Sequence, residues 1–398
     1  MSIYLHNIDL LKDVAKSKDV SFLFLLLTVF FLPLSINISS YCVLLSLLLK
    51  FFQVIVLKEK LFATNLLKTS SKIGFIFFIY IIINSIIQTD FMFTINVFEE
   101  EFSHFALFFI VPILIPNKSY KVFLANILLI SVFFTVVYVF IITLFKNVSF
   151  NNNAFEDILH LHHTYLATYI LLAVHFLLFS LYTKKKLVLD VKVIISVGFL
   201  IFSFLVIFLL GSKFSMVVLL LFIASYTLVF LKNNKKGLIL LYSILLIIFI
   251  IFNKKINTSY KSALDFRIEI WQQCVNSIKQ NLFFGDLTMS EKDVLCKMHY
   301  LSGKYYLFDS DLNSHNQYLS LLLRFGLVGF IIFIILCLQL FRSNSLKINN
   351  SNLINILGFS MVFLSVFYIE NILDRHHGIV FFTIFFNYYL VTTANEKL

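Results

Sequence analysis

The sequence predicts an all-α polytopic membrane protein, and three observations carry that prediction. Of the 398 residues, 60% are hydrophobic and only 13% are charged, and the mean hydropathy is +0.93. Such a chain has too much apolar surface for a water-soluble domain. Its long apolar runs favour helices, because a helix satisfies its own backbone in lipid, whereas the strands of a membrane barrel alternate apolar and polar residues.

Twelve apolar segments are interpreted as membrane spans, and those at 102–115 and 238–252 are the shortest. In chain order they cover 20–36, 39–57, 73–88, 102–115, 122–145, 164–183, 193–210, 214–231, 238–252, 316–341, 352–369 and 378–394. We therefore expect about twelve transmembrane helices. Nine lie in residues 1–252 and three in residues 316–398, and a long helical loop at 253–315 separates them.

Basic residues set the expected orientation. With a cytoplasmic N-terminus, nineteen lysines and arginines fall on inside segments, and only Lys146, Lys213 and Arg375 fall on short outside loops. This imbalance predicts that both termini are cytoplasmic and that 253–315 lies on the outer face. The net charge of +11 then reflects topology and contact with anionic membrane lipids, and it indicates no nucleic-acid partner.

The 253–315 loop is expected to carry function, because a long structured loop in a compact membrane protein is rarely only a connection. Within it, residues 262–285 have helical periodicity. Their stripe holds Arg267, Trp271, Cys274, Val275, Ile278 and Leu282. One interpretation is an amphipathic helix on the membrane surface, anchored by Trp271. The other is that Arg267 grips a phosphate with paired donors.

This loop closes with a histidine at the start of a leucine-rich helix. Ser314, followed three residues later by Gln317, predicts a capping box, which places His315 and Asn316 in the first helical turn. A helix N-terminus attracts phosphate and disfavours an imidazolium ion, so His315 is expected to be neutral and able to accept a proton. The alternative is that His315 merely begins the helix.

A second cation occupies an unusual place. Gly211, Ser212 and Lys213 make up almost the whole outside turn between two spans. A turn this short holds the ammonium group of Lys213 at the bilayer surface. Charges at such a boundary are costly and often functional. The alternative is a lysine that snorkels toward water.

The order of these motifs resembles that of the O-antigen ligase and O-antigen polymerase superfamily, bacterial inner-membrane glycosyltransferases that use lipid-diphosphate-linked glycans. The motifs are a Gly-Ser-Lys turn, an Arg-x3-Trp helix ending in Phe-Gly, and His-Asn-x-Tyr-Leu followed by Gly-x2-Gly, all between residues 211 and 330. LHHTYLATY at 161–169 is similar to a histidine–tyrosine stretch of some members. Two features depart from the family. Lys213 stands where arginine is usual, and the Phe-Phe-Gly turn lacks the preceding proline and the second glycine.

The resemblance implies a GT-C-like membrane fold with its active site on the periplasmic face of the bacterial inner membrane. Lys213 and Arg267 would hold the diphosphate of an undecaprenyl carrier, and His315 would activate the acceptor hydroxyl without a metal or other cofactor. The supporting residues would be Ser314, Asn316, Trp271 and His163. The donor would be an undecaprenyl-diphosphate-linked glycan and the acceptor a lipid core or a saccharide, with inversion at the transferred sugar.

Three rival functions stay open. A polymerase that joins repeat units would share the donor chemistry and differ only in the acceptor. A metal-dependent transferase using a polyprenyl-phosphate sugar would bind its ion through Asp309, Asp311 or the Glu99–Glu101 run. A transporter would be expected to show internal repeats and polar midplane helices, whereas this sequence shows no internal repeat and few charges within its spans.

Three neighbouring histidines form another candidate site. His160, His162 and His163 could ligate a metal ion, since imidazole is a common zinc ligand. Only the nearby Glu156 and Asp157 supply carboxylates at a suitable spacing. The pattern by itself therefore indicates a metal site only weakly.

The remaining polar groups have plainer interpretations. Glu370 and Arg375 are expected to pair with each other in the last outside turn. Arg324 is interpreted as an interfacial cation near the start of the tenth span. The spacing of Cys274 and Cys296 leaves open whether they form a disulfide in an oxidising compartment.

Overall fold

The computed structural model describes residues 20–89, 95, 97–116, 121–183, 191–230, 265–310, 312–342 and 350–394, and within these residues every element is a helix. The all-α prediction is confirmed. In chain order the longer helices are α2 (Val20–Phe31), α3 (Ile36–Val56), α4 (Asn65–Gln88), α6 (Leu107–Leu114), α7 (Lys121–Lys146), α8 (Asn152–Leu159), α9 (His163–Thr183), α10 (Val191–Leu209), α11 (Lys213–Phe230), residues 265–280, α13 (Glu291–Leu301), α15 (Gln317–Arg342), α16 (Asn350–Phe367) and α17 (His376–Ala394). The short ones are η1 (Phe98–Phe102), η2 (Ser103–Ala106), α14 (Tyr305–Phe308) and η4 (Ile372–Asp374).

Five helices are long and apolar enough to cross a membrane, which makes the chain a multi-pass membrane protein. They are Ile36–Val56, Asn65–Gln88, Phe123–Lys146, His163–Thr183 and Gln317–Phe341. Four shorter apolar helices accompany them: Val20–Phe31, Val193–Leu209, Lys213–Leu228 and Leu353–Phe367. The count of twelve spans and the outer position of 253–315 stay predictions, and the ninth predicted span, 238–252, lies outside the described residues.

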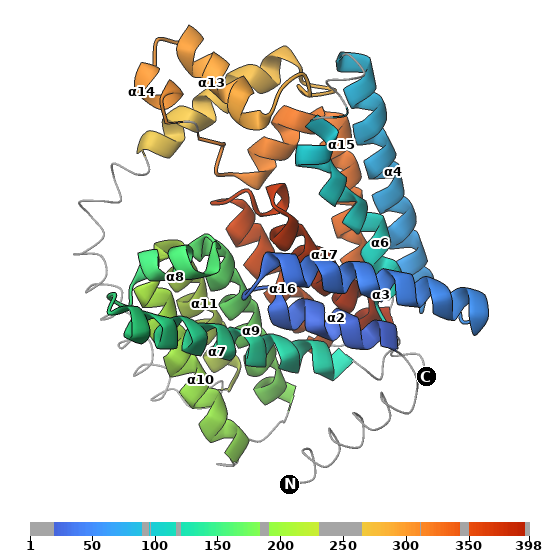
Figure 1. Cartoon of the computed structure of the whole chain (residues 1–398), viewed down its shortest axis with the longest axis vertical. Helices are drawn as coiled ribbons and strands as arrows, with labels where there is room; N and C mark the ends of the chain where they lie inside the picture. The colour runs from blue at the N-terminus through green and yellow to red at the C-terminus, as the bar shows by residue number, and fades with distance from the viewer. Residues whose placement is uncertain are drawn as a thin grey trace.

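The helices form two groups with α16 and α17 between them (Figure 1). One group contains α7 to α11 and the other contains α4, α6 and α15. Among the five long apolar helices α9 is the most enclosed. Its apolar stretch is 89% buried, against 28–44% for the other four. Because α9 is a core helix, its first residue, His163, has a fixed position at one end of the bundle.

The first predicted span, 20–36, is a broken segment. Its helix stops at Phe31, five residues before the predicted end of the span. The chain turns there and α3 packs back along α2. Serine hydroxyls of α3 fasten the pair, with Ser46 donating to the carbonyl of Ser21 (2.7 Å) and Ser39 to that of Thr28 (3.2 Å). Such hydrogen bonds are a usual way of holding helices together in lipid.

The predicted span 316–341 is interrupted as well. Gly326 has φ 61° and ψ −169°, a conformation that only glycine adopts readily. Three backbone hydrogen bonds of 2.8–3.1 Å join residues 323–328, at this break, to the segment 282–286. A Cβ atom on Gly326 would lie 2.4 Å from the carbonyl oxygen of Phe283. The Phe-Phe-Gly turn is therefore hydrogen-bonded to the backbone of α15 at its break. This contact holds the helix at 265–280 over the start of α15.

Residues 265–310, here called the cap, form a small helical layer at one end of the molecule, above the start of α15 (Figure 1). The cap and the first turns of α15 share an apolar cluster of their own. Its buried members are Ile270, Cys274, Ile278, Val294, Leu295, Leu307 and Leu323. The cap is thus a packed unit with its own core.

The predicted stripe of residues 262–285 is only partly right. Cys274 and Ile278 are buried. Val275 and Leu282 are instead 39% and 43% exposed, and Ile270, which is not part of the predicted stripe, is buried. The helix ends at residue 280, so Leu282 belongs to the turn. Cys274 and Cys296 are not joined by a disulfide.

Candidate functional site

A cavity of about 280 Å³ lies where the cap meets the helix bundle. Lys213 and Arg267 both line it, together with Trp271 and His163. Four residues that the sequence analysis singled out, from three separate helices, are therefore neighbours. Two basic side chains at one cavity form an environment suited to an anion.

Lys213 is the first residue of α11, and the turn before it is as short as predicted. Gly211 has φ 66°, a left-handed conformation that lets the chain reverse between α10 and α11. Ser212 donates a hydrogen bond of 2.7 Å from its hydroxyl to that of Ser215. The cavity therefore receives the N-terminal end of a helix as well as an ammonium group, and both favour negative charge.

Trp271 links the cavity to the segment that carries His315. Its indole N–H donates to the carbonyl of Ser314 at 2.9 Å, and its ring lies edge-on to Tyr368 with centroids 5.3 Å apart. The indole therefore holds the cap against the residue that precedes His315, a role that the membrane-anchor interpretation did not include.

The predicted capping box is wrong, because α15 begins at Gln317, two residues later than that motif requires. Asn316 is the capping residue, since its Oδ1 accepts hydrogen bonds from the N–H groups of Tyr318 (3.0 Å) and Leu319 (3.2 Å). The hydroxyl of Ser314 and the amide of Gln317 are instead engaged by the 371–374 turn. The side chains of Ser314 and Gln317 thus form hydrogen bonds with residues distant in sequence, and not with the backbone of each other.

His315 consequently precedes the helix. It has φ 46°, which is uncommon and strained for a residue with a Cβ and often marks a functional site. Nδ1 of its imidazole lies 3.6 Å from Oε2 of Glu370. The expectation that the helix dipole keeps His315 neutral assumed a place in the first helical turn, so it does not apply here. The carboxylate of Glu370 is the electrostatic partner of His315.

Glu370 lies between two imidazoles. The same Oε2 atom is 3.8 Å from Nδ1 of His162, and the side chain is only 9% exposed. Burial raises the pKa of Glu370, but the nearby imidazoles of His315 and His162 outweigh it and hold the pKa below its usual value. Glu370 was expected to pair with Arg375, but its partners in the structure are histidines from two other parts of the chain.

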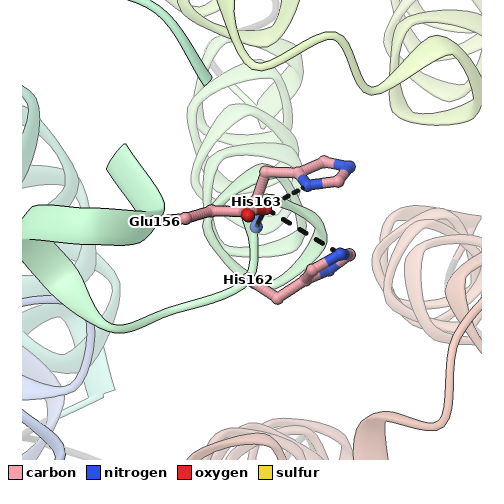
Figure 2. Close-up of side chains that lie close together, drawn as sticks. All are labelled: Glu156, His162 and His163. Atoms are coloured by element: carbon pink, nitrogen blue, oxygen red, sulfur yellow. Dashed lines mark hydrogen bonds and ion pairs between the residues drawn. The ribbon is translucent and has the colours of Figure 1, made fainter. Parts of the chain in front are cut away.

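His163 and His162 meet a second carboxylate. Nδ1 of His163 is 2.6 Å from Oε1 of Glu156, and Nε2 of His162 is 3.8 Å from the same oxygen. Figure 2 shows Glu156 reaching from α8 toward both rings at the start of α9. Carboxylates and imidazoles thus alternate from His163 to His315.

Arg324 is buried, and the interpretation as an interfacial cation is wrong. Its side chain is 3% exposed, and it donates to Oδ1 of Asp374 at 3.0 Å and to Oε2 of Glu101 at 3.3 Å. The guanidinium also lies 4.7 Å from the ring centre of Phe102. An arginine within an apolar run is a signal of a buried partner, but the sequence did not indicate which carboxylates would reach it.

Glu291, which no sequence motif indicated, connects this buried network to the His315 segment. It is 4% exposed and accepts hydrogen bonds from the backbone N–H of Ser314 (2.8 Å) and from the amide of Asn371 (3.0 Å). The amide oxygen of Asn371 in turn accepts from the N–H of Asn316 at 2.7 Å. Both neighbours of His315 are therefore held by buried polar side chains, as a precisely oriented imidazole requires.

The acidic residues of the metal-dependent alternative do not come together as one group in the described part of the chain. Asp309 is exposed at the end of α14, and Asp311 lies outside the described residues. Glu99 and Glu100 are exposed, while Glu101 is engaged by Arg324.

A comparison with protein families identifies the central part of the chain. Residues 198–334 match the family model described as O-antigen ligase. We call these residues the O-antigen ligase domain, after the family that they resemble. The domain covers about a third of the chain and includes Lys213, Arg267, His315 and Arg324. The resemblance to the O-antigen ligase and polymerase superfamily is thus confirmed, while no curated protein sequence matches the chain.

The O-antigen ligase domain does not contain the whole candidate site. His163 lies at the cavity, in the α9 helix before the matched segment, and Glu370 lies beside His315, in the turn after α16 that follows this segment. The flanking helices therefore complete the surroundings of the domain. Membrane-bound glycan transfer, of the ligase or the polymerase kind, is the broad activity that the domain supports.

Proposed function

We propose that this protein transfers a saccharide from an undecaprenyl-diphosphate donor to a lipid-core acceptor on the periplasmic face of the inner membrane. The reaction is inverting and uses no metal. One observation carries the proposal: Lys213 and Arg267 line a single cavity, and Trp271, in the wall of that cavity, is hydrogen-bonded to the residue before His315. The O-antigen ligase domain supports the same class of reaction.

The two cations act on the leaving group. When the glycosidic bond to the carrier breaks, the diphosphate gains negative charge, and fixed positive charges lower the barrier most if they are in place beforehand. Arg267 offers paired donors that match phosphate oxygens. Lys213 adds a point charge at the N-terminus of α11, where the backbone N–H groups favour the same anion.

His315 acts on the acceptor. A neutral imidazole takes the proton from the attacking hydroxyl, and the hydroxyl oxygen attacks the anomeric carbon from the face opposite the diphosphate. Glu370 stabilises the imidazolium that forms, because its carboxylate is 3.6 Å from Nδ1. The polar side chains around residues 314 and 316 keep the imidazole aimed during the step.

Ligase and polymerase activities share this chemistry and differ in the acceptor. A lipid-core sugar makes the protein a ligase, and the end of another lipid-linked repeat makes it a polymerase. We favour the ligase, whose family model matches the central domain.

The test is transfer by the purified full-length protein, given an undecaprenyl-diphosphate glycan and a lipid-core acceptor, with and without EDTA. We expect His315→Ala and Arg267→Ala each to lower the rate by at least about 100-fold, and EDTA to leave the wild-type rate unchanged. Lys279→Ala, an exposed cation on the same helix as Arg267, is the matched control. A wild-type rate in His315→Ala or in Arg267→Ala would refute the role assigned to that residue. Loss of activity in EDTA would favour the metal-dependent alternative.

A further inference from the structure

The group formed by Glu156, His162 and His163 has the composition and spacing of a metal site. Each residue offers one ligand atom, and the three atoms lie within 4.8 Å of one another. Two imidazoles and one carboxylate form a ligand set typical of zinc and related divalent transition metals, whereas calcium and magnesium prefer oxygen ligands alone. The sequence left this metal site open, and it is the fold that brings Glu156 into position.

The distances need little adjustment to fit one ion. Ligand atoms on a tetrahedral zinc ion, each about 2.0–2.1 Å from the metal, lie about 3.3 Å apart. The pairs from Oε1 of Glu156 to the two imidazoles measure 2.6 and 3.8 Å, on either side of that value. In Figure 2 both rings are turned toward the carboxylate. The third pair, between the two imidazole nitrogens, is no longer than 4.8 Å, so the three atoms already surround a common centre.

The backbone holds the three ligands in place. Asn151 caps the start of α8 by accepting a hydrogen bond from the N–H of Ala154, and α8 ends at His160 in a left-handed conformation that turns the chain back. The N–H of His163 donates to Glu156 Oε1 at 3.2 Å. Because the carboxylate belongs to α8 and the histidines lie at and just before the start of α9, the site forms within one short stretch of the chain.

Glu370 supplies the outer support that such sites usually have. If His162 binds the metal through Nε2, on the side that faces Glu156, its Nδ1 faces Oε2 of Glu370 at 3.8 Å. A carboxylate behind a metal-bound histidine fixes its tautomer and orientation, and its loss typically weakens binding by about 10–100-fold. That Nδ1 atom is buried and has no hydrogen-bond partner within the described residues. Metal binding through Nε2 would fix the position of the ring, and Nδ1 would then have a role as the atom that faces the carboxylate of Glu370.

We propose that Glu156, His162 and His163 bind one divalent transition metal ion of the zinc class, with Glu370 behind His162 and a fourth position open. The ion ties α8 to the start of α9 at the edge of the cavity that His163 lines. The site shares Glu370 with His315, but the proposed transfer chemistry uses no metal and the test of the metal site needs no glycan.

The experiment is zinc titration of the purified full-length protein after removal of any polyhistidine tag. Binding is followed by competition with a chromophoric chelator, and the bound metal is counted by elemental analysis. We expect one zinc ion per chain, no comparable binding of Mg²⁺, and a higher unfolding temperature with zinc. Glu156→Gln and His162→Ala should each weaken binding at least about tenfold, and Glu370→Gln by about 10–100-fold. His160→Asn, which replaces an exposed histidine nearby and suits the left-handed conformation, should bind as wild type.

Two results would overturn the proposal: wild-type protein that binds no zinc, or Glu156→Gln and His162→Ala variants that bind it as tightly as wild type. Co²⁺ binding by the wild-type protein is the second readout, because the visible absorption of Co²⁺ reports its coordination without any mutation that could disturb folding. A spectrum identical to aqueous Co²⁺ would also contradict the assignment. Transfer activity that fails while zinc binds refutes the proposed function alone.

Discussion

The carboxylate of Glu370 lies 3.6 Å from Nδ1 of His315, although 55 positions of sequence separate them. Glu370 belongs to the turn after α16, and His315 precedes α15 in a left-handed conformation. A base that is oriented by a buried carboxylate is a recurrent arrangement in catalysis. This pair exists only because the tertiary fold brings the two residues together.

Replacing Glu370 by Gln should lower kcat for glycan transfer by about 10–100-fold and leave KM for the lipid-linked donor nearly unchanged. The amide keeps the shape but cannot stabilise an imidazolium ion, whereas the cations that bind the donor are untouched. Steady-state rates in zinc-free buffer measure both constants. Glu99→Gln, at an exposed carboxylate, should behave as wild type. A rise in KM without a fall in kcat would argue that Glu370 supports the cavity rather than the base.

The two cations should respond differently to exchange between arginine and lysine. Arg267→Lys keeps the charge and loses the fork of donors, so we expect transfer to slow by about tenfold. Lys213→Arg adds that fork at the cavity and should retain or raise the wild-type rate. Initial rates with the lipid-linked donor measure both effects. Equal losses in the two variants would mean that shape at the cavity matters more than the number of donors.

Asp374 should make the fold less stable as the pH rises. Burial raises its pKa most, Arg324 opposes that shift and Glu291 adds to it, and the result is a pKa of about 7 in place of 3.8. The folded protein then keeps a proton that the unfolded chain releases above about pH 4. Stability from this proton is therefore complete at low pH and is lost as the pH rises through about 7.

Thermal unfolding in detergent at about pH 5.5 and pH 8 tests this dependence. The wild type should unfold at a lower temperature at the higher pH, and Asp374→Asn, which cannot ionise, should show a smaller difference. Asp309→Asn, at an exposed carboxylate, gives the background slope from other groups. A difference in Asp374→Asn as large as in wild type would mean that Asp374 does not titrate in this range.

Gly326→Ala should destabilise the protein by about 2–4 kcal/mol, because the new methyl group meets the carbonyl of Phe283 and the residue must keep a conformation that suits glycine. Gly303→Ala is the matched control. Gly303 also has a positive φ of 70°, but open space surrounds the position of its Cβ. It should cost only about 1 kcal/mol. Chemical unfolding in mixed micelles compares the two, and equal losses would show that the Phe-Phe-Gly turn does not need close contact with α15.

Composition and motif order were sufficient for the class of this protein. Apolar runs predict helices in lipid whatever the partners are, since each helix makes its own backbone hydrogen bonds. The Gly-Ser-Lys turn is short in the structure because so few residues separate two helices, and the O-antigen ligase domain covers the motifs that suggested it. These features depend on neighbours in sequence, so the sequence alone could determine them.

The side-chain pairing was decided by tertiary structure. Arg324 was interpreted as interfacial and is buried against Asp374 and Glu101, and Ser314 and Gln317 were paired with each other and are held by the 371–374 turn. A buried polar group must be satisfied by whatever the fold brings near it, and the periodicity of one helix does not identify partners 50 or more residues away. The sequence thus determined the membrane class and the candidate cations, and only the packing of separate helices determined which groups surround His315.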